Sequence, residues 1–482
     1  MDGALLLENP KEKVRVINLN ETAQMQKMKA IEGMIGLEIH TYLVTKEKLF
    51  CGCLASRERG LTSNVNICPI CTGQPGAKPM LPNKNAVEKA VLIGLMLECR
   101  INERMEWQRK HYDWPDLPKG YQNTISGGTS GVGVNGEFHG IGIWSMHLEE
   151  DPAAWEPDTG CVDYNRSGLP LVEIVTAPDF VNSNEVVNWL KVLLHNLSYL
   201  KSVDSNAGIK VDVNVNLSGK TERVEIKNLN SIENIGKAIE FELERQMNEG
   251  SERETRRFDE MKGKTFRMRG KEEAEDYRFI SDPDLLDVVL DANVINELEK
   301  SIPESPEKKL ENLIKKYKIG DKDANVLTQH LDIAEFFEEV VGKGKFDVGF
   351  ALPWITVELF RFLNYNKVTL DKIDVRVEHF IELLEAVRSG KISVLKGKQI
   401  LNEFHPKSFS ISGVVKKEGK ISDEDELEKI GKQVIKENTK AVGDYKNGDE
   451  KSFNFLIGKV MEKTNRRADF IIVRKVLEKL LK

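Results

Sequence analysis

The 482-residue sequence lacks an apolar run long enough to cross a membrane, which would need roughly 18 uninterrupted apolar residues. Its beginning, residues 1–26, is polar and charged after a short apolar run, without the basic start and long apolar stretch of a secretory signal. We therefore expect a cytoplasmic protein with no membrane association. Six cysteines in a chain of this length do not suggest a disulfide scaffold.

A phosphate-binding loop of the Walker type is absent as well. The segment 131–136 matches the dinucleotide pattern G-x-G-x-x-G, but that pattern should follow a strand and open a helix. The residues that come next, 137–144, alternate in polarity as a strand does. Because Asn135-Gly136 is a preferred hairpin turn, we predict a β-hairpin here and no dinucleotide site.

The net charge of −7 is unusual for a protein that binds nucleic acid, but the charge is unevenly distributed. Residues 407–482 hold 18 Lys and Arg against 13 Asp and Glu, which is a net charge of +5 and leaves −12 for the remainder. This asymmetry predicts an acidic body with a basic tail. A solvated helical surface is the alternative interpretation of the tail.

The chain is long enough for two or more domains, since a single core rarely exceeds about 300 residues. Short apolar runs or alternating residues predict strands at 34–40, 171–175 and 209–215, and helical spacing predicts helices at 85–97 and 184–200. Farther along, apolar residues at 453–461 and 472–480 follow helical spacing. We predict an α+β fold in four parts: an N-terminal extension (1–30), a mixed domain (31–295), a helical domain (296–406) and a helical tail (407–482).

Four of the cysteines form two tight pairs, Cys51 with Cys53 and Cys68 with Cys71. Each short loop can direct two sulfur atoms at a common point, so this spacing predicts a tetrahedral zinc site. The zinc would have a structural role because protein ligands fill all four positions. A C-x-x-C redox pair is the alternative for Cys68 and Cys71, but it does not account for the other two cysteines.

Carboxylates and a histidine gather in segments predicted to be strands. Glu38 and His40 are two residues apart, so their side chains share one face of a strand. Glu149 and Glu150 follow an apolar run, and Glu173 lies inside another, where an unpaired carboxylate is costly. Hard oxygen ligands suit Mg²⁺, and Mg²⁺ suits phosphoryl transfer. The alternative is a set of satisfied ion pairs with a histidine at the edge of the core.

A series of polar motifs runs along the chain in a fixed order. They lie at 35–40, 112–122, 147–151, 163–174, 227–231, 254–258, 276–279, 444–448 and 455–458. Together they resemble the B and E subunits of the aminoacyl-tRNA amidotransferases, over about residues 31–482. The most specific stretch contains Asp163-Tyr164-Asn165-Arg166 and, after a short gap, Pro170-Leu171-Val172-Glu173-Ile174.

The resemblance implies a cradle-like catalytic domain, a helical connector and a small helical tail that contacts tRNA. It implies that ATP phosphorylates the side-chain carboxylate of Asp-tRNA(Asn), Glu-tRNA(Gln) or both, and that ammonia then gives the amide. The two side chains differ by one methylene, so the sequence leaves the choice of substrate open. The implied partners are an amidase A subunit that frees ammonia from glutamine and a small C subunit, in a heterotrimer.

The resemblance also implies roles for individual residues. The implied catalytic residues are Glu38, His40, Glu149, Glu150 and Glu173, and all of these except Glu150 are implied ligands of Mg²⁺. The residues implied to contact ATP are Asn165, Arg166, Lys210, Lys227 and Asn228. The four paired cysteines match zinc positions found in some members of the family.

Some features distinguish this chain within the family. After Phe279 there is no room for the large extra domain of the E subunit, which favours the B subunit. Lys210 stands where the family usually has Arg, so the charge is kept but the bidentate fork is lost. Residues 281–286 replace a proline-rich segment. The alternative function is an inactive, zinc-containing homologue that binds tRNA, but the retained acidic residues favour an enzyme.

Overall fold

The computed structural model describes residues 32–58, 60–126, 131–204, 208–270, 277–418, 424–446, 448–465 and 467–481. The predicted N-terminal extension, 1–30, lies outside the described residues, as do Asn206, Ala207 and Asp276. The chain divides into two compact units, the first ending at Pro303 and the second running from Glu304 to Lys482.

The first unit is built on a large mixed sheet, which has 12 strands within the described residues. In order across its main path these are β14 (Lys264–Gly270), β13 (Glu254–Asp259), β12 (Val224–Leu229), β11 (Lys210–Leu217), β1 (Gly33–Tyr42), β10 (Pro170–Thr176), β7 (Ile141–Glu150), β5 (Gln122–Ile125), β4 (Gln108–His111) and β15 (Arg278–Ser281). Beside this path, β6 (Gly133–Phe138) pairs with β7 and with β2 (Arg100–Ile101). Neighbouring strands are antiparallel except β12 and β13. Two small ribbons complete the unit: β3 (Arg104–Met105) with β16 (Val288–Val289), and β8 (Ala154–Trp155) with β9 (Val162–Asp163).

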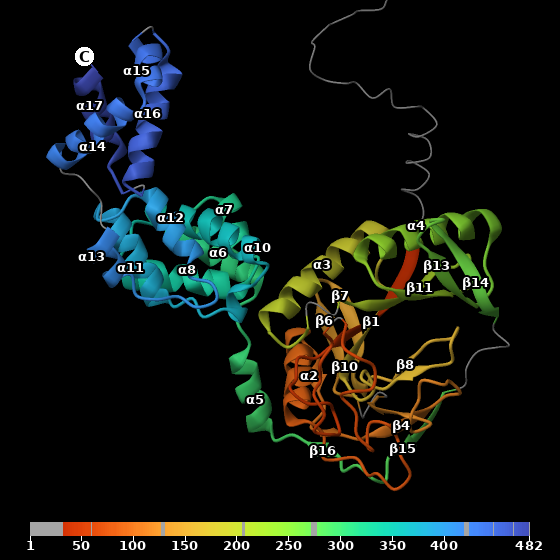
Figure 1. Cartoon of the computed structure of the whole chain (residues 1–482). Coiled ribbons are helices and arrows are strands. Elements are labelled where there is room, and N and C mark those ends of the chain that lie inside the picture. Colours follow the sequence, from red (N-terminus) through yellow and green to blue (C-terminus); the bar gives the residue numbers. More distant parts are fainter. Residues whose placement is uncertain are drawn as a thin grey trace, which may run out of the picture. The chain divides into compact units, whose positions relative to one another are not determined.

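The central strands have one apolar and one polar face because their residues alternate. Ile35, Leu37 and Ile39 of β1 are at most 1% exposed and belong to the core of the unit. Residues of α2 (Lys84–Met96), α3 (Ser183–Tyr199) and α4 (Ile232–Glu249) complete this core (Figure 1). The opposite face of β11, β1, β10 and β7, which we call the polar face, carries Glu38 and His40.

Polar caps fix where these helices begin. The side chains of Asn83, Asn182 and Ser231 accept hydrogen bonds from backbone N–H groups in the first turns of α2, α3 and α4, respectively. The helices predicted at 85–97 and 184–200 and the three predicted strands are all confirmed. The boundaries follow local signals, namely a cap before each helix and alternation along each strand.

The predicted hairpin is confirmed, but its predicted turn is wrong. Strands β6 and β7 are joined by His139 and Gly140, which both have a positive φ and are flanked by the pair Phe138 and Ile141. Asn135-Gly136 lies inside β6 instead. A Cβ atom on Gly136 would lie 2.4 Å from the backbone oxygen of Leu97, so this glycine permits a close approach between chain segments.

After α5 (Ala292–Ser301) the chain is helical, as the sequence predicts, and the α+β fold class is confirmed. One core of the second unit is formed by helices with the following bounds: α6 (Pro306–Tyr317), α7 (Asp321–Leu327), α8 (Leu331–Gly344), α9 (Val348–Pro353), the π-helix η2 (Trp354–Leu359), α10 (Phe360–Asn366), α11 (Val377–Arg388) and α12 (Val394–Asn402). A separate core joins α14 (Glu424–Glu437), α16 (Glu450–Lys463) and α17 (Phe470–Leu481), with α15 (Thr439–Lys446) packed against it.

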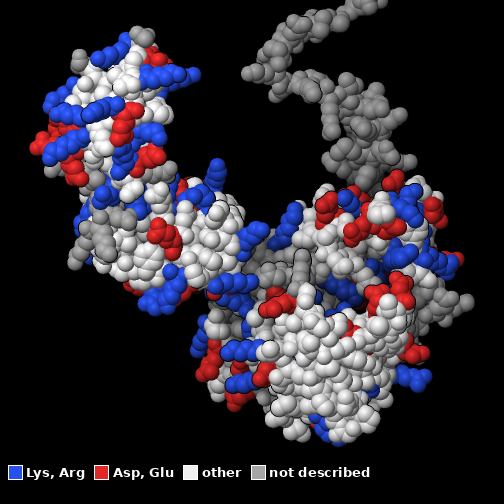
Figure 2. Space-filling view, viewed as in Figure 1, with Lys and Arg blue, Asp and Glu red and all other residues white. Residues whose placement is uncertain are grey.

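The last helices carry much of the basic charge that the sequence places in the tail. Figure 2 shows Lys and Arg side chains gathered on α14–α17, interspersed with Asp and Glu. The predicted domain boundaries at 295 and 406 stay predictions. Among the described residues, no helix combines the length and apolar character that a bilayer crossing requires.

Candidate functional site

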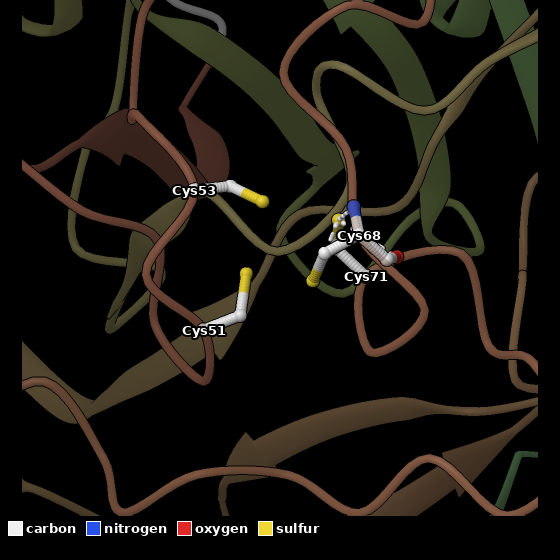
Figure 3. A group of neighbouring side chains, drawn as sticks. All are labelled: Cys51, Cys53, Cys68 and Cys71. Atoms are coloured by element: carbon white, nitrogen blue, oxygen red, sulfur yellow. Dashed lines mark hydrogen bonds between the residues drawn. The ribbon is translucent and has the colours of Figure 1, made fainter.

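The four paired cysteines meet in space, and we call them the cysteine cluster (Cys51, Cys53, Cys68 and Cys71). Two loops after β1 supply them, and their sulfur atoms point toward one another (Figure 3). All four sulfur atoms lie within 4.8 Å of one another, and those of Cys68 and Cys71 are 3.9 Å apart. Tetrahedral zinc with Zn–S bonds of about 2.3 Å would place sulfur atoms about 3.8 Å apart, so this donor set is compatible with zinc.

The thiols of the cysteine cluster have pKa values that shift in opposite directions, and a hydrogen bond with Cys71 raises the pKa of Cys51 well above its usual range. A hydrogen bond with Cys51 is the main cause that lowers the pKa of Cys71 to about 5, and the charge of Lys48 acts in the same direction. Burial raises the pKa of Cys53 to about 11. Lys48 is only 1% exposed, and its Nζ donates to the carbonyl oxygens of Asn66 (2.8 Å) and Tyr164 (3.1 Å). This buried cation would offset part of the negative charge of four thiolates on zinc.

A row of three side chains crosses the polar face. In the strand register, Glu173 of β10 lies between His40 of β1 and His147 of β7. Its carboxylate lies 3.6 Å from His40 Nε2 and 2.9 Å from His147 Nδ1. Burying an unpaired carboxylate within an apolar run costs free energy. The two histidines pair with Glu173 and so account for its burial.

Glu149 of β7 joins His40 and Glu173, and we call these three residues the histidine cluster. One ligand atom from each lies within 4.8 Å of the others. The Glu149 carboxylate accepts hydrogen bonds from Thr124 Oγ1 (3.0 Å) and Gln122 Nε2 (3.2 Å). These bonds from β5 fix the orientation of a carboxylate that is only 2% exposed.

A second group of carboxylates lies on the same face, and we call it the acidic cluster (Glu38, Asp212 and Glu225). Glu38 of β1 lies opposite Asp212 of β11, and Glu225 comes from β12. The Nζ of Lys227 lies 3.0 Å from Glu225 and 3.6 Å from Asp212. The backbone N–H of Asn228, which has a positive φ, donates to Asp212 (2.8 Å).

Burial and neighbouring charges move the pKa values of these groups in opposite directions. Burial, and then the charge of Glu173, raise the pKa of Glu38 above its usual range. Burial alone would also raise the pKa of Glu173, but the His147 hydrogen bond and the charges of His40, His147 and Lys110 hold it below its usual range. Burial opposes a charged Lys110, yet Glu149 and Glu173 raise its pKa. The site therefore holds an ionised Glu173 beside the partly buried cation of Lys110.

The histidine cluster also offers an unused ligand atom. His40 Nδ1 is buried and has no hydrogen-bond partner among the described residues. The other ring nitrogen, Nε2, faces Glu173 (3.6 Å), so His40 presents a nitrogen atom to the carboxylates of the cluster, and this donor set fits a metal ion. Carboxylate oxygens favour a hard cation such as Mg²⁺.

The structure does not bring every predicted site residue to these clusters. Glu150 follows Glu149 on β7 and faces the other way, where its carboxylate accepts from the Asn123 backbone N–H (3.0 Å) and pairs with Lys119. Lys210 lies opposite His40 on β11 and is exposed.

Asn165 and Arg166 hold loops together. Asn165 bonds to the backbone of Thr62 and Asn66 in the segment between the two cysteine pairs. Arg166 donates to the carbonyl oxygens of Pro152 and Ala153. It also forms an ion pair of 3.1 Å with Asp151.

Comparison with known proteins identifies the family. Residues 33–296 match the model of the GatB/GatE catalytic domain, and residues 335–481 match a GatB domain model. The chain is 44% identical to the B subunit of the aspartyl/glutamyl-tRNA(Asn/Gln) amidotransferase of Methanocaldococcus jannaschii, over 92% of this chain and 96% of that protein. The corresponding B subunit of Methanopyrus kandleri is 42% identical, with 93% and 98% covered. This chain belongs to the amidotransferase B-subunit family.

Sequence reasoning missed several residues of this B-subunit site. His147 lies in the motif at 147–151 but has no predicted role, and Asp212, Glu225 and Lys110 lie outside the motifs. Alternation gives a signal for two of them, because His147 shares a face with Glu149 and Asp212 shares one with Lys210. Lys110 reaches Glu149 (3.8 Å) from β4, a contact that depends on the order of strands in the sheet.

Proposed function

We propose that this B subunit catalyses the ATP-dependent amidation of misacylated tRNA, as a carbon–nitrogen ligase with glutamine as amido donor. The substrate is Asp-tRNA(Asn), Glu-tRNA(Gln) or both. The observation that carries the proposal is the histidine cluster on the polar face, where His40, Glu149 and Glu173 converge beside the partly buried cation of Lys110. The names of the relatives support the same reaction class.

The proposed reaction has two steps, phosphorylation of the carboxylate and then its amidation. A side-chain carboxylate oxygen of the aminoacyl group attacks the γ-phosphorus of ATP, and ADP leaves. Ammonia then attacks the carbon of the acyl phosphate, inorganic phosphate leaves, and the nitrogen loses a proton to give the amide. The first step is needed because a free carboxylate is a poor acyl donor.

The histidine cluster, with Glu38 beside it, would hold Mg²⁺. The ion supplies positive charge that neutralises the transferring phosphoryl group. Thr124, Gln122 and His147 keep the two carboxylates of the cluster in orientation by hydrogen bonds. These hydrogen bonds hold the carboxylates in place before an ion binds.

Cations on the polar face would bind the phosphates of ATP. Lys110 and Lys227 are held there by carboxylates, and Lys210 is exposed beside His40. The exposed Asn228 follows Lys227, and Asn165 and Arg166 would shape the adjoining loops. We propose that these residues position ATP, with Glu150 supporting the end of β7 through Asn123 and Lys119.

The proposal includes partners and a location. An amidase A subunit would deliver ammonia, a small C subunit would complete a heterotrimer, and the basic tail at 407–482 would contact tRNA. Zinc in the cysteine cluster would be structural. We propose a cytoplasmic location, where translation takes place.

The competing function is an inactive homologue that binds tRNA and zinc. Such a protein has no physical need for two clusters of buried or half-buried carboxylates on one face. The convergence of His40, Glu149 and Glu173 therefore favours the enzyme.

The test is amide formation by the full chain with its A and C partners, ATP, Mg²⁺, ammonia and misacylated tRNA. We expect Glu173→Gln to remove amide and ADP formation together, with a loss of at least ~100-fold. The matched control is Glu311→Gln on α6, an exposed carboxylate, which should keep full activity. Tight tRNA binding without amide or ADP from the wild-type chain would establish the inactive homologue instead.

A further inference from the structure

Arg57 presents a guanidinium that no carboxylate of the described residues binds. It lies in the loop that follows Cys53, and its side chain is exposed. Its Cζ lies 3.4 Å from the centre of the Tyr42 ring, which is a close cation–π contact. A contact this close favours a guanidinium parallel to the ring, so its N–H donors point past the ring and remain available to a ligand.

Strand geometry places the Tyr42 ring on the polar face. Tyr42 ends β1 two residues after His40, so both side chains point to the same face, about 7 Å apart along the strand. In the register, Tyr42 lies opposite Leu171 of β10, and Leu171 lies opposite Glu149 of β7. Two strand spacings, about 10 Å, therefore separate Tyr42 from this carboxylate of the histidine cluster.

Lys210 approaches the same ring from the neighbouring strand. It is the cross-strand partner of His40 on β11, which makes it the diagonal neighbour of Tyr42 on the polar face, at about 7–8 Å. Its side chain is exposed, and within the described part of the chain no ion pair holds it. Long side chains reach across such a diagonal, so Lys210 and Arg57 can contact one ligand between them.

The carboxylates of this region do not neutralise the two exposed cations. Asp151 is 5% exposed, accepts from the Tyr42 hydroxyl (2.8 Å) and pairs with Arg166 (3.1 Å). Burial is the main cause that raises the pKa of Asp151, and it also raises the pKa of Asp116. The surplus positive charge favours an anionic ligand.

Phosphate is the anion that suits this pair of cations. Lys210 offers an ammonium group, which binds phosphate as a point charge, and Arg57 offers a planar fork whose two N–H groups match two oxygens of one phosphate. The Tyr42 ring restricts the guanidinium before a ligand arrives, which reduces the entropy lost on binding. The nearby histidine cluster is where phosphoryl transfer is proposed, so phosphates of the substrates come within reach.

We propose that Arg57 binds a phosphate group of a substrate at the polar face, together with Lys210, and that Tyr42 positions the Arg57 guanidinium. This inference deepens the proposed function and rests on it. The phosphate belongs either to ATP or to the 3′ end of the tRNA, since both bring phosphate oxygens to the site of phosphoryl transfer.

The experiment measures the binding of ATP, inorganic tripolyphosphate and the trinucleotide CCA to the full chain with Mg²⁺ present. Arg57→Gln should weaken at least one of them roughly 10-fold, as expected for the loss of hydrogen bonds to a charged group. Arg57→Lys should restore only part of the affinity, because the charge returns without the fork. The matched control is Arg223→Gln, which changes an exposed arginine beside the opposite end of β11 and should bind all three probes as the wild type does.

Variants of Tyr42 separate a positioning role from a structural one. Tyr42→Phe keeps the ring and should keep the affinity for the probes within about twofold, whereas Tyr42→Ala should reproduce the loss seen in Arg57→Gln. In the double variant the two losses should not add, since they act through one contact. Fully additive losses would overturn the positioning role of Tyr42.

The pattern of losses identifies the source of the phosphate. Weaker binding of ATP and tripolyphosphate with unchanged CCA assigns Arg57 to the nucleotide, and weaker binding of CCA alone assigns it to the tRNA end. Wild-type affinity for all three probes in Arg57→Gln overturns the inference, as does an equal loss in Arg223→Gln. These binding measurements need no turnover, so their failure is distinct from a failure of amide formation, which would overturn the proposed function.

Discussion

The cysteine cluster and the histidine cluster lie in the same unit but are built in different ways. The first takes four soft ligands from two loops within residues 51–71, and a zinc ion there would have no open position. The second takes a histidine and two carboxylates from three different strands, β1, β7 and β10. Three ligands leave room for substrate oxygens on a six-coordinate cation.

The difference in construction gives the cysteine cluster a structural role and the histidine cluster a chemical role. The two loops lie outside the named strands and are held mainly by local turn hydrogen bonds, so zinc bound by the cysteine cluster would add to their rigidity. The histidine cluster stands on strands that are already held by their neighbours, so its ion would contribute chemistry and little to folding. If stability and metal chemistry are divided in this way, variants of one cluster should leave the metal of the other cluster unchanged.

Removing one ligand of the cysteine cluster should give the largest effect. We expect Cys71→Ser to lose zinc and to expose the loops between β1 and α2 to proteolysis, since structural zinc contributes ~10 kcal/mol in small zinc peptides. Zinc content and limited proteolysis measure both results. Cys161→Ser changes an exposed cysteine outside the cluster and should change neither. Full zinc content in Cys71→Ser would disprove the four-ligand site.

His147→Ala should affect the histidine cluster alone. His147 Nδ1 lies 2.9 Å from Glu173 and orients it, and loss of such an orienting partner typically weakens a metal site 10- to 100-fold. Titration with Mn²⁺ in place of Mg²⁺, followed by electron paramagnetic resonance, measures the affinity. Zinc content should not change. The exposed His330 provides the control His330→Ala, and equal Mn²⁺ affinity in both variants would argue against an orienting role.

The cysteine cluster could be predicted from the sequence more completely than the histidine cluster. Cysteine spacing is local, so Cys51, Cys53, Cys68 and Cys71 could be grouped without knowledge of the fold. Alternation placed Glu38 and His40 on one face, but the alignment of Glu173 between two histidines depends on strand register. Pairing of strands far apart in sequence is set by the whole sheet, which local patterns do not encode.

Two other differences have separate causes. Adjacent residues on a strand face opposite ways, so Glu149 and Glu150 could not both join one cluster, and alternation alone would have separated them. The turn at His139-Gly140 replaced Asn135-Gly136 because Gly136 is needed for close packing against Leu97. That packing is tertiary and leaves no mark in the turn sequence.

Asp282 is a buried carboxylate whose partners are protein side chains alone, so it shows what such a group contributes to stability without a metal ion. Asp282 pairs with Arg109 (3.0 Å) and accepts from Asn123. Burial opposes its ionisation, but the Arg109 hydrogen bond holds its pKa below the usual range. Its stabilising effect should be complete above about pH 4 and be lost as the pH falls through the lowered pKa of the folded state.

We expect Asp282→Asn to lower the free energy of unfolding by about 2 kcal/mol at neutral pH, as for a hydrogen bond to a charged group. Urea titrations at pH 7 and at pH 3 measure the difference, which should shrink at the lower pH. Metal content and Mn²⁺ affinity should stay at wild-type values. An equal loss of stability at both pH values would show that the charge of Asp282 is not what stabilises the fold.

The smallest predicted effect concerns Tyr42, which ends β1 and lies in the chain between His40 and Cys51. Its hydroxyl donates to Asp151 (2.8 Å), and the guanidinium of Arg57, from the loop between the cysteine pairs, lies 3.4 Å from the centre of its ring. Tyr42→Phe removes the hydroxyl and keeps the ring, so we expect a loss of about 1 kcal/mol in unfolding free energy.

Because the ring still supports Arg57, zinc content and Mn²⁺ affinity should both stay within about twofold of wild type, as expected if the clusters act independently. Tyr42→Ala then removes the ring as well and should loosen the Arg57 loop without releasing zinc. If Tyr42→Phe instead lowers Mn²⁺ affinity tenfold with zinc retained, the two clusters are coupled through β1, and the division between a structural and a chemical site fails.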